Sequence, residues 1–428
     1  MGKGRKIESA LAGLIFIGGA LAAGADGPLT FRDCVALALR QSPVLAVSEM
    51  EIGLERLGEA DSRADYFPRF SLQTRYYLDQ PEGSDRRFYL EFRVDPYNPV
   101  EAHLSLKAQR LLTRIAMLSH VQAVAECLQR LGETFLELDI LARMESLDND
   151  LVAVAEKRAA QVSYRYRMGS ASEPEWQAVE QEAAIFRLQR EQHKALRSAR
   201  RETLGAWLGL PDPALPEADV RDAAEQVWGK DRPGAAVWES VRTNSVELQI
   251  REIRNELQAL NITAARAAYI PDLLIGLRTP DPLSGLNDED FYFSVGVDIP
   301  LWDGWKRARN VHRQRRKLEQ QLAGNVLGEL EFRMQWRAAE NACRLAELEW
   351  RTAKAREDLA DARRRQAEMV SGPEAEDDDE AMAARLAWLQ AGRETLRQAL
   401  ARDKARLDLD FITGNLLNRY CHTGMENP

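Results

Sequence analysis

The sequence predicts a mixed α and β membrane protein with two internal repeats, each a β-hairpin plus long coiled-coil-like helices. Three observations predict this fold class: an export-type N-terminus, a repeat at an offset of 203 residues, and strands whose two faces differ in polarity. The chain has 428 residues, 29% charged and 45% hydrophobic, which is ample material for a core. We therefore expect four strands per chain to contribute to an oligomeric β-barrel that a helical wall continues.

The first 25 residues predict a secretory signal peptide. Basic residues at positions 3, 5 and 6 precede the apolar run 11–23, and the small residues at 23–25 suit a signal peptidase. We expect residues 1–25 to be removed on export, and a short membrane anchor is the alternative. Beyond them the sequence has no uninterrupted run of 18 apolar residues, so we expect any membrane crossing to use strands rather than a second helix.

A repeat organises the rest of the chain. At an offset of 203 residues, identical residues align without a gap. The aligned pairs include Ser42 with Ser245, Tyr66 with Tyr269, Pro68 with Pro271, Phe88 with Phe291 and Asp95 with Asp298. We assign residues 26–210 to a first repeat and 236–414 to a second, joined by a linker at 211–235 and followed by a tail at 415–428.

Each repeat opens with a helix that a proline closes, Pro68 or Pro271. Apolar and polar residues then alternate, which predicts β-hairpins at 68–95 and 271–299. Strands of about ten residues with one apolar face are typical of transmembrane barrels. On alternation alone, two hairpins packed on a soluble core fit equally well.

Four strands are too few to close a barrel, because single-chain barrels start at about eight strands and lipid does not tolerate open edges. Strands from several subunits must then complete the wall. Two copies would supply about 8 strands and three about 12, and the strand pattern fits either. The polar strand positions are the expected lining of the lumen: Arg75, Tyr77, Tyr89, Glu91, Arg93, Tyr292 and Asp298.

Each hairpin leads into a long helical stretch almost free of glycine and proline, so we expect helical hairpins at 100–209 and 303–413. About 65 residues of helix span roughly 100 Å. In the second repeat, Leu345, Thr352 and Leu359 step by seven and predict a coiled-coil seam. A plain two-stranded coiled coil fits this stretch as well.

The two helical hairpins differ at their turns. In the first, Gly169 suits the left-handed end of a helix, Ser170 follows it, and Ser172 suits the cap of the next helix. The second turn carries an acidic run: Glu374, Glu376, Asp377, Asp378, Asp379 and Glu380. Around a symmetric mouth these carboxylates would concentrate cations, while a solvated charged loop is the alternative.

Motifs of enzymes and cofactor sites are missing from the sequence. The five histidines are dispersed without metal-ligand spacing, and there is no phosphate-binding glycine loop or nucleophile elbow. The four cysteines form no paired motif and fit small buried residues. A net charge of −9 argues against nucleic acid as a partner. We expect no catalytic residue, no metal and no cofactor.

Several segments resemble the TolC family of outer-membrane efflux proteins. The stretch 297–304, Val-Asp-Ile-Pro-Leu-Trp-Asp-Gly, is similar to the strand-to-helix junction of that family. Residues 29–43 resemble its opening helix, and 166–172 its first hairpin turn. The resemblance covers nearly the whole chain beyond residue 25. It departs from the family at 94–99, the first strand-to-helix junction, and at the acidic second turn.

The resemblance implies a homotrimer in the bacterial outer membrane, with a 12-stranded barrel continued by a periplasmic α-helical barrel. It also implies an exit duct of a tripartite efflux system, a passive conduit for small molecules, whose tip contacts a periplasmic adaptor and an inner-membrane pump. The turn residues Gly169, Ser170 and Ser172 would lie at the adaptor contact. Alternatives are the outer-membrane component of a type I protein secretion system and a periplasmic coiled-coil adaptor or scaffold.

Overall fold

The computed structural model describes residues 29–67, 70–76, 88–210, 220, 222–228, 237–278, 292–299, 302–371 and 378–422. The expected signal peptide at 1–25 lies outside this part. By its internal contacts the chain divides into two compact units. The first consists of residues 1–46, 122–245 and 332–428, and the second of residues 47–121 and 246–331.

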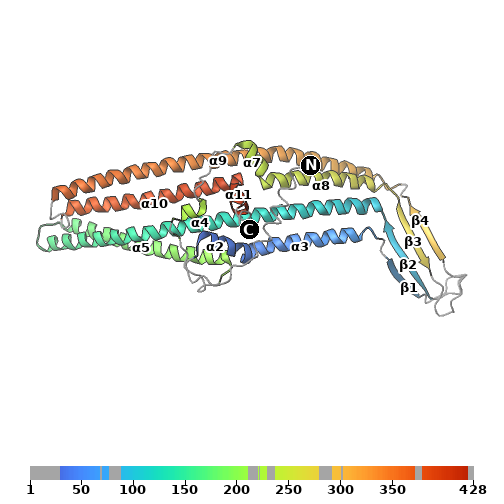
Figure 1. Cartoon of the computed structure of the whole chain (residues 1–428), viewed down its shortest axis with the longest axis horizontal. Helices are drawn as coiled ribbons and strands as arrows, with labels where there is room; N and C mark the ends of the chain where they lie inside the picture. Colours follow the sequence, from blue (N-terminus) through green and yellow to red (C-terminus); the bar gives the residue numbers. More distant parts are fainter. Residues whose placement is uncertain are drawn as a thin grey trace. The chain divides into compact units, whose positions relative to one another are not determined.

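Four strands and ten helices make up most of the described chain (Figure 1). The strands are β1 Phe70–Tyr76, β2 Phe88–Tyr97, β3 Asp272–Arg278 and β4 Tyr292–Asp298. The helices are α2 Phe31–Gln41, α3 Pro43–Ala64, α4 Pro99–Arg167, α5 Glu173–Leu208, α6 Ala223–Trp228, α7 Trp238–Asn244, α8 Val246–Ala267, α9 Lys306–Ser371, α10 Asp379–Thr413 and α11 Asn415–His422.

The opening helix of the first repeat is divided in two, where we expected one. Helix α2 begins with a capping box, in which the Thr30 side chain accepts the backbone N–H of Asp33 and the Asp33 carboxylate accepts that of Thr30. It ends at Gln41, and Pro43 starts α3, because proline suits the first position of a helix and cannot continue one. Helices α3 and α8 occupy ranges that are 203 residues apart.

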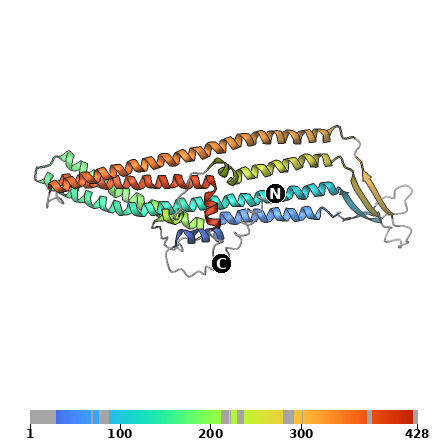
Figure 2. The ribbon, with the colours of Figure 1, turned by 45° about the horizontal axis from the view of Figure 1, so that its top comes forward.

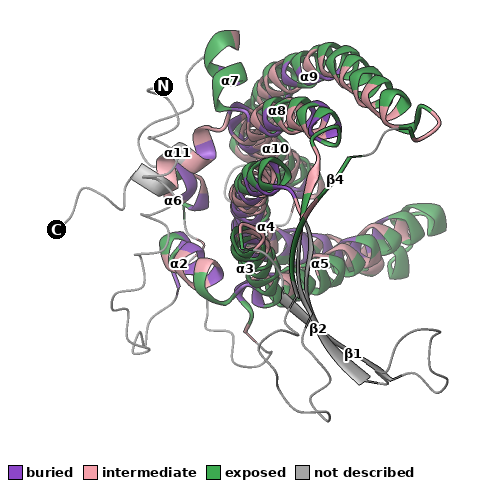
Figure 3. Cartoon of the chain, turned by 90° about the vertical axis from the view of Figure 1, so that its right-hand side faces the viewer, coloured by how far each residue is buried: buried purple, intermediate pink, exposed green. Residues whose placement is uncertain are grey.

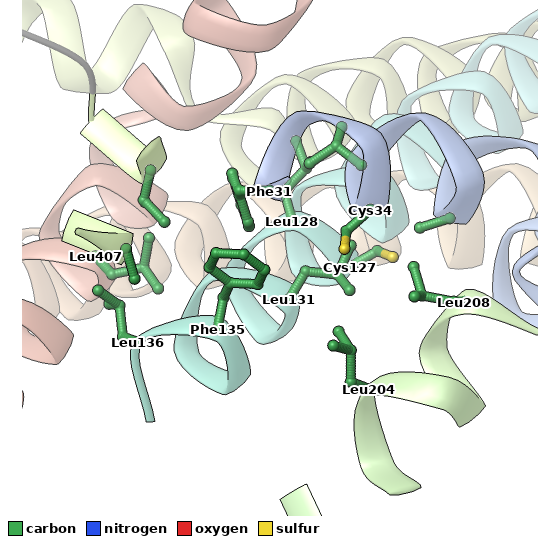
Figure 4. Packing of buried hydrophobic residues seen from close by; sticks show 14 of the residues in the cluster. Phe31, Cys34, Cys127, Leu128, Leu131, Phe135, Leu136, Leu204, Leu208 and Leu407 are labelled. Atoms are coloured by element: carbon green, nitrogen blue, oxygen red, sulfur yellow. The ribbon is translucent and has the colours of Figure 1, made fainter. Parts of the chain in front are cut away.

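The core of the first unit joins residues of seven helices, and Figure 4 shows part of it. Phe31 of α2 and Phe135 of α4 are both buried, with ring centroids 5.4 Å apart in an edge-to-face contact. Leu208 of α5, Trp228 of α6 and Leu416 of α11 are buried in the same cluster, which Leu407 of α10 completes. The expected linker and tail therefore both contribute to this core, through α6 and α11.

Polar bonds fix the short helices to this core. The indole Nε1 of Trp228 donates to the buried Asp410 carboxylate at 3.1 Å. The Tyr420 hydroxyl donates to the Val227 carbonyl at 2.7 Å. Cys34 and Cys127 are buried here as free thiols, in agreement with the expected role of small buried residues. Burial raises the pKa of Cys34 to about 12, so its thiol stays protonated.

The second unit contains the sheet and the helices that enter and leave it. Figure 2 shows α3 beside the first part of α4, and α8 beside the first part of α9. Gln109 of α4 donates to the Glu55 carbonyl at 3.3 Å, and Gln258 of α8 donates to the Gln314 carbonyl at 2.9 Å. At Gly58 a Cβ would lie 2.7 Å from the Gln109 amide nitrogen, so a larger residue there would displace this contact.

Helix α4 has an 18-residue window of mean hydropathy 1.2, of which 33% is buried, so by length and composition it could cross a membrane. The expectation that any membrane crossing uses strands rests on a different test, an uninterrupted run of 18 apolar residues, which α4 does not contain. Scattered polar residues interrupt every apolar run in α4, yet they leave the average of one window high enough. Core helices of soluble proteins meet the same criterion.

Both strand-to-helix junctions are capped by a short polar side chain. Helix α9 begins at Lys306 rather than at Asp303 as expected, because the Asp303 carboxylate accepts the backbone N–H groups of Lys306 and Arg307. At the first junction, Asn98 accepts the N–H groups of Val100 and Glu101. The unusual stretch 94–99 therefore keeps a helix cap.

Asn98 also connects the two repeats, because its amide donates to the Asp272 carboxylate at 3.2 Å. We expect Asn98→Ala to lose the cap and this bond, lowering the free energy of unfolding by about 1–2 kcal/mol. Asn98→Asp should keep the cap but repel Asp272, and adding Asp272→Asn should restore the pair. Thermal unfolding in detergent measures all three variants, and equal melting of the wild type and Asn98→Ala would contradict the role of Asn98.

Candidate functional site

The four strands form one antiparallel sheet in the order β1-β2-β3-β4. Strand β2 pairs with β3 as well as with β1, so the two hairpins share a single sheet. Among the described residues, β1 and β4 each pair on one side only, which leaves two open edges. Such edges carry backbone N–H and C=O groups that another strand can pair with.

The register places the expected lumen residues on one face of the sheet. Residues directly opposite each other in neighbouring strands share a face. The cross-strand pairs are Arg75 with Tyr89, Arg93 with Gly276, Glu91 with Arg278, Arg278 with Tyr292, and Asp272 with Asp298. Tyr77 lies outside the described residues. Polar positions from all four strands thus share one face.

The register places apolar residue types at the positions of the other face of the sheet. One row across the strands is Phe70, Val94, Ile275 and Val295, and the next is Leu72, Phe92, Leu277 and Phe293. In β4 the apolar side chains are exposed, with Phe293 69% and Val295 62% accessible (Figure 3). An exposed apolar surface of this kind marks contact with lipid or with another protein.

Two helices of the second unit also expose apolar stripes. On α3, Val47, Met50, Leu54 and Leu57 are all more than half exposed and recur at steps of three and four. On α9, Leu322, Val326 and Leu330 recur at steps of four, and Val326 is 73% exposed. Helix α3 precedes β1 and α9 follows β4, so both stripes belong to helices next to the open sheet edges. Apolar side chains at this spacing suit knobs-into-holes packing against another helix.

The seam expected in α9 does not pack within the chain. Leu345 and Leu359 are more than half exposed, while Ala346 and Ala353 are buried instead. Arginine contacts join α9 to α10, since Arg406 pairs with Glu347 at 2.8 Å and Arg402 lies over the Trp350 ring at 4.3 Å. The spacing of seven is present in the sequence. The residues buried within the chain, however, are Ala346 and Ala353, which directly follow Leu345 and Thr352.

The first helical turn has the conformation expected of its residue types. Gly169 adopts φ 76°, and the Ser172 side chain accepts the backbone N–H of Glu175 at the start of α5. The Ser170 hydroxyl donates to the Arg165 carbonyl at 3.0 Å. Tyr166 stacks on Trp176 across the turn, with ring centroids 5.2 Å apart. These contacts give the turn a defined surface.

The second turn differs from the expected cluster of solvated carboxylates. Glu374, Glu376 and Asp377 lie outside the described residues. Asp378 caps α10 by accepting the backbone N–H of Glu380, and it also accepts the Ser371 hydroxyl. Of the six carboxylates, the structure describes Asp378, Asp379 and Glu380. Asp378 stabilises the start of α10 through its side-chain hydrogen bonds.

Asp379 is neutralised by two arginines of α4 that the sequence did not point to. It lies 2.7 Å from Arg158 and 3.6 Å from Arg165, and Arg158 also pairs with Glu182 of α5 at 3.1 Å. The hydrogen bond from Arg158 lowers the pKa of Asp379 below its ordinary value. Asp379 therefore ties the start of α10 to the first helical hairpin.

We expect Asp379→Asn to destabilise the tip at neutral pH by about 1 kcal/mol, since the ion pair is partly buried. A lowered carboxyl pKa stabilises the fold above the unfolded value of about 4, and this contribution disappears as the pH falls through the folded value. The difference in melting temperature between wild type and variant should thus shrink from pH 7 to pH 3. Glu380→Gln, which removes a neighbouring exposed carboxylate, is the control, and a pH-independent difference would contradict the prediction.

Among the described residues, no group of three or more His, Cys, Asp or Glu side chains is arranged to bind a metal. One buried polar cluster joins Asp148, His193 and Arg393, from α4, α5 and α10. His193 lies 2.5 Å from the Asp148 carboxylate, and Arg393 lies 3.5 Å from it. This arrangement fits the pairing of a buried charge between packed helices.

No family model matches the sequence, and no curated protein matches it. The fold is nevertheless similar to solved structures. CusC, solved in a study of transmembrane channel formation, has a TM-score of 0.74 at 12% identity over 90% of this chain and 92% of its own. The MtrE outer membrane channel of Neisseria gonorrhoeae, in its open state, has a TM-score of 0.72 at 14% identity over 90% and 88%. The CmeC outer membrane channel of Campylobacter jejuni has a TM-score of 0.70 at 12% identity over 95% and 94%.

Proposed function

From the fold shared with these outer membrane channels, we propose that the chain is one subunit of a homotrimeric outer-membrane duct of the TolC type. Three copies of the sheet close a 12-stranded barrel, and the long helices continue it into the periplasm as an α-helical barrel. The duct is a passive conduit for small molecules, which an inner-membrane pump delivers through a periplasmic adaptor at the helical tips. The chain catalyses no reaction in this role.

One observation carries the proposal: a four-stranded sheet with an apolar face and two open edges. In hydrocarbon, each unpaired backbone group costs several kcal/mol, because lipid offers no hydrogen-bond partner. The apolar face suits lipid, so the edges must be paired by other copies. A periplasmic adaptor with a separate β-rich module is not supported, since the strands of the described residues all belong to this one sheet.

The number of copies follows from the need for a passage. A barrel of about eight strands, from two copies, has an interior that side chains fill. A barrel of about 12 strands, from three copies, leaves more room along its polar face. That face would carry Arg75, Glu91, Arg93 and the other residues of the expected lumen lining.

The edge helices support side-by-side assembly of copies. The apolar stripes of α3 and α9 would meet where one copy's β1 pairs with the next copy's β4. Charges of opposite sign extend these stripes: Asp61 lies seven residues after Leu54 on α3, and Arg315 lies seven residues before Leu322 on α9. Their attraction would favour this pairing over contact between identical edges.

We expect Val326→Asp to prevent assembly, because it places a carboxylate in the apolar contact of every copy. Val326 is 73% exposed in the single chain, so the folding of the chain itself should not suffer. A loss of about 2 kcal/mol or more per contact shifts trimers towards monomers. The mass of the detergent-solubilised particle and its conductance in planar bilayers measure the effect.

Gln320→Asp adds the same charge to an exposed position on another side of α9, and it is the matched control. It should keep the trimer mass and the conductance of the wild type. A wild-type protein that purifies without detergent as a monomer would overturn the proposed function itself.

At the helical tips, the carboxylates of Glu374, Glu376 and Asp377 would form a negative ring around the mouth. Neutralising these three to glutamine and asparagine should reduce the preference for cations over anions, measured as the reversal potential of the bilayer conductance under a salt gradient. Glu380→Gln, which removes one exposed carboxylate of the same run, should reduce this preference by less than the triple variant. An unchanged reversal potential would mean that the acidic run does not contribute to selectivity.

A further inference from the structure

We propose that the start of α9 binds the anionic headgroups of glycerophospholipids in the periplasmic leaflet of the membrane, through Lys306, Arg309 and Arg313. This inference rests on the proposed function, since it needs the strands to cross the membrane. The structure contributes four observations: a basic stripe on one side of the helix, the direction of that side, its distance from the last strand, and two exposed tryptophans.

The basic stripe is separate from the surface where copies associate. Lys306, Arg309 and Arg313 are exposed and recur at steps of three and four, so they share one side of α9. At 3.6 residues per turn, Arg313 and Val326 lie about 140° apart around the helix. The stripe therefore stays accessible when the apolar contact forms.

The direction of the stripe follows from the two neighbours of α9. Gln314 and Asn325 mark the side that contacts α8, and Val326 marks the side that meets the next copy. Measured around the axis of α9, these two sides are about 110° apart in one direction of rotation and about 250° apart in the other. In a closed ring of helices the two neighbours subtend less than half a turn on the inner side. The basic stripe lies in the wider sector and so faces the outside of the ring.

The stripe also lies close to the membrane boundary. Strand β4 ends at Asp298 and α9 begins at Lys306. From Lys306 to Arg313 the helix rises by about 10 Å, comparable to the thickness of a headgroup layer and to the reach of its surface potential. Long basic side chains can extend towards the phosphates from this distance.

Two tryptophans mark the interface between the apolar strand face and the basic stripe. Trp302 is 81% exposed and Trp305 is 69% exposed, both between β4 and α9. Trp305 adopts φ 65°, a strained conformation for a large residue. Tryptophan is enriched at the headgroup level of membranes, where its ring is partly in hydrocarbon and its N–H meets polar groups. The two tryptophans, which are exposed in a single chain, would therefore contact the headgroup layer of the membrane.

The three basic groups are available for an external anion. No carboxylate of a described residue forms an ion pair with Lys306, Arg309 or Arg313, whereas Arg307 pairs with Asp303 and Arg316 with Glu319. At the equivalent positions, 203 residues earlier, α4 carries His103, Leu106 and Arg110. The surface is therefore specific to the second repeat and would occur three times around a trimer.

The test uses the full-length chain purified in detergent and equilibrated with vesicles of equal parts phosphatidylglycerol and phosphatidylcholine. Native mass spectrometry counts the lipids retained by each oligomer. We expect an about tenfold lower preference for phosphatidylglycerol over phosphatidylcholine in the triple variant Lys306→Gln, Arg309→Gln, Arg313→Gln. The reason is that each basic residue near an anionic surface contributes to the binding of anionic lipid. The wild-type preference should also decrease as the salt concentration rises.

The control variant is Arg337→Gln, Arg344→Gln, Arg351→Gln, which removes three exposed arginines from the same helix far from the strand. It should retain the wild-type preference. The inference is overturned if the wild type shows no preference for phosphatidylglycerol, or if both triple variants show the same preference. It is also overturned if the first triple variant no longer forms trimers while its monomers keep the wild-type preference for phosphatidylglycerol. A channel-forming trimer without lipid preference would leave the proposed function intact, whereas a wild type that never forms membrane oligomers would remove both.

Discussion

The open edges of the sheet are the constraint on which the rest of the structure depends. A strand at an edge has one row of backbone donors and acceptors without partners, and hydrocarbon supplies none. Because β1 and β4 are the edges, the helices attached to them, α3 and α9, are brought to the same boundary between copies. In the proposed assembly, one mode of association would therefore close both the sheet and the helical wall.

The two units achieve stability by different means. The first unit buries Phe31, Phe135 and Leu407 in a core that needs no second copy. The second unit buries some apolar residues but also joins its helices through amide contacts such as Gln258 to Gln314, while Val47 and Val326 stay exposed. Its apolar surface is directed outward, where a soluble monomer would bury it. This distribution is what a subunit of a larger wall requires.

Local patterns in the sequence predicted the local structure well. Alternation located the strands, proline located the ends of the opening helices, and Gly169 with Ser172 located a helical turn, because each depends on neighbours within a few residues. Contacts between distant residues left no such signal. The pairing of β2 with β3, the bond from Asn98 to Asp272 and the ion pair of Asp379 with Arg158 join residues more than 170 apart. The seam in α9 is a further example. A period of seven predicts that a helix has an apolar stripe, but it does not predict which helix packs against that stripe.

The order of the first unit along the chain constrains how the protein is made. Its core joins Phe31 near the beginning to Leu416 near the end, with the whole second unit divided between them. Under the proposed function the chain is exported from its N-terminus, and it cannot close this core until α11 has followed the earlier segments. The early segments must wait with their leucines and phenylalanines uncovered, at a stage when such surfaces aggregate readily. Under the proposed function, assembly would thus need holding factors in the periplasm that cover these surfaces until α11 reaches the core.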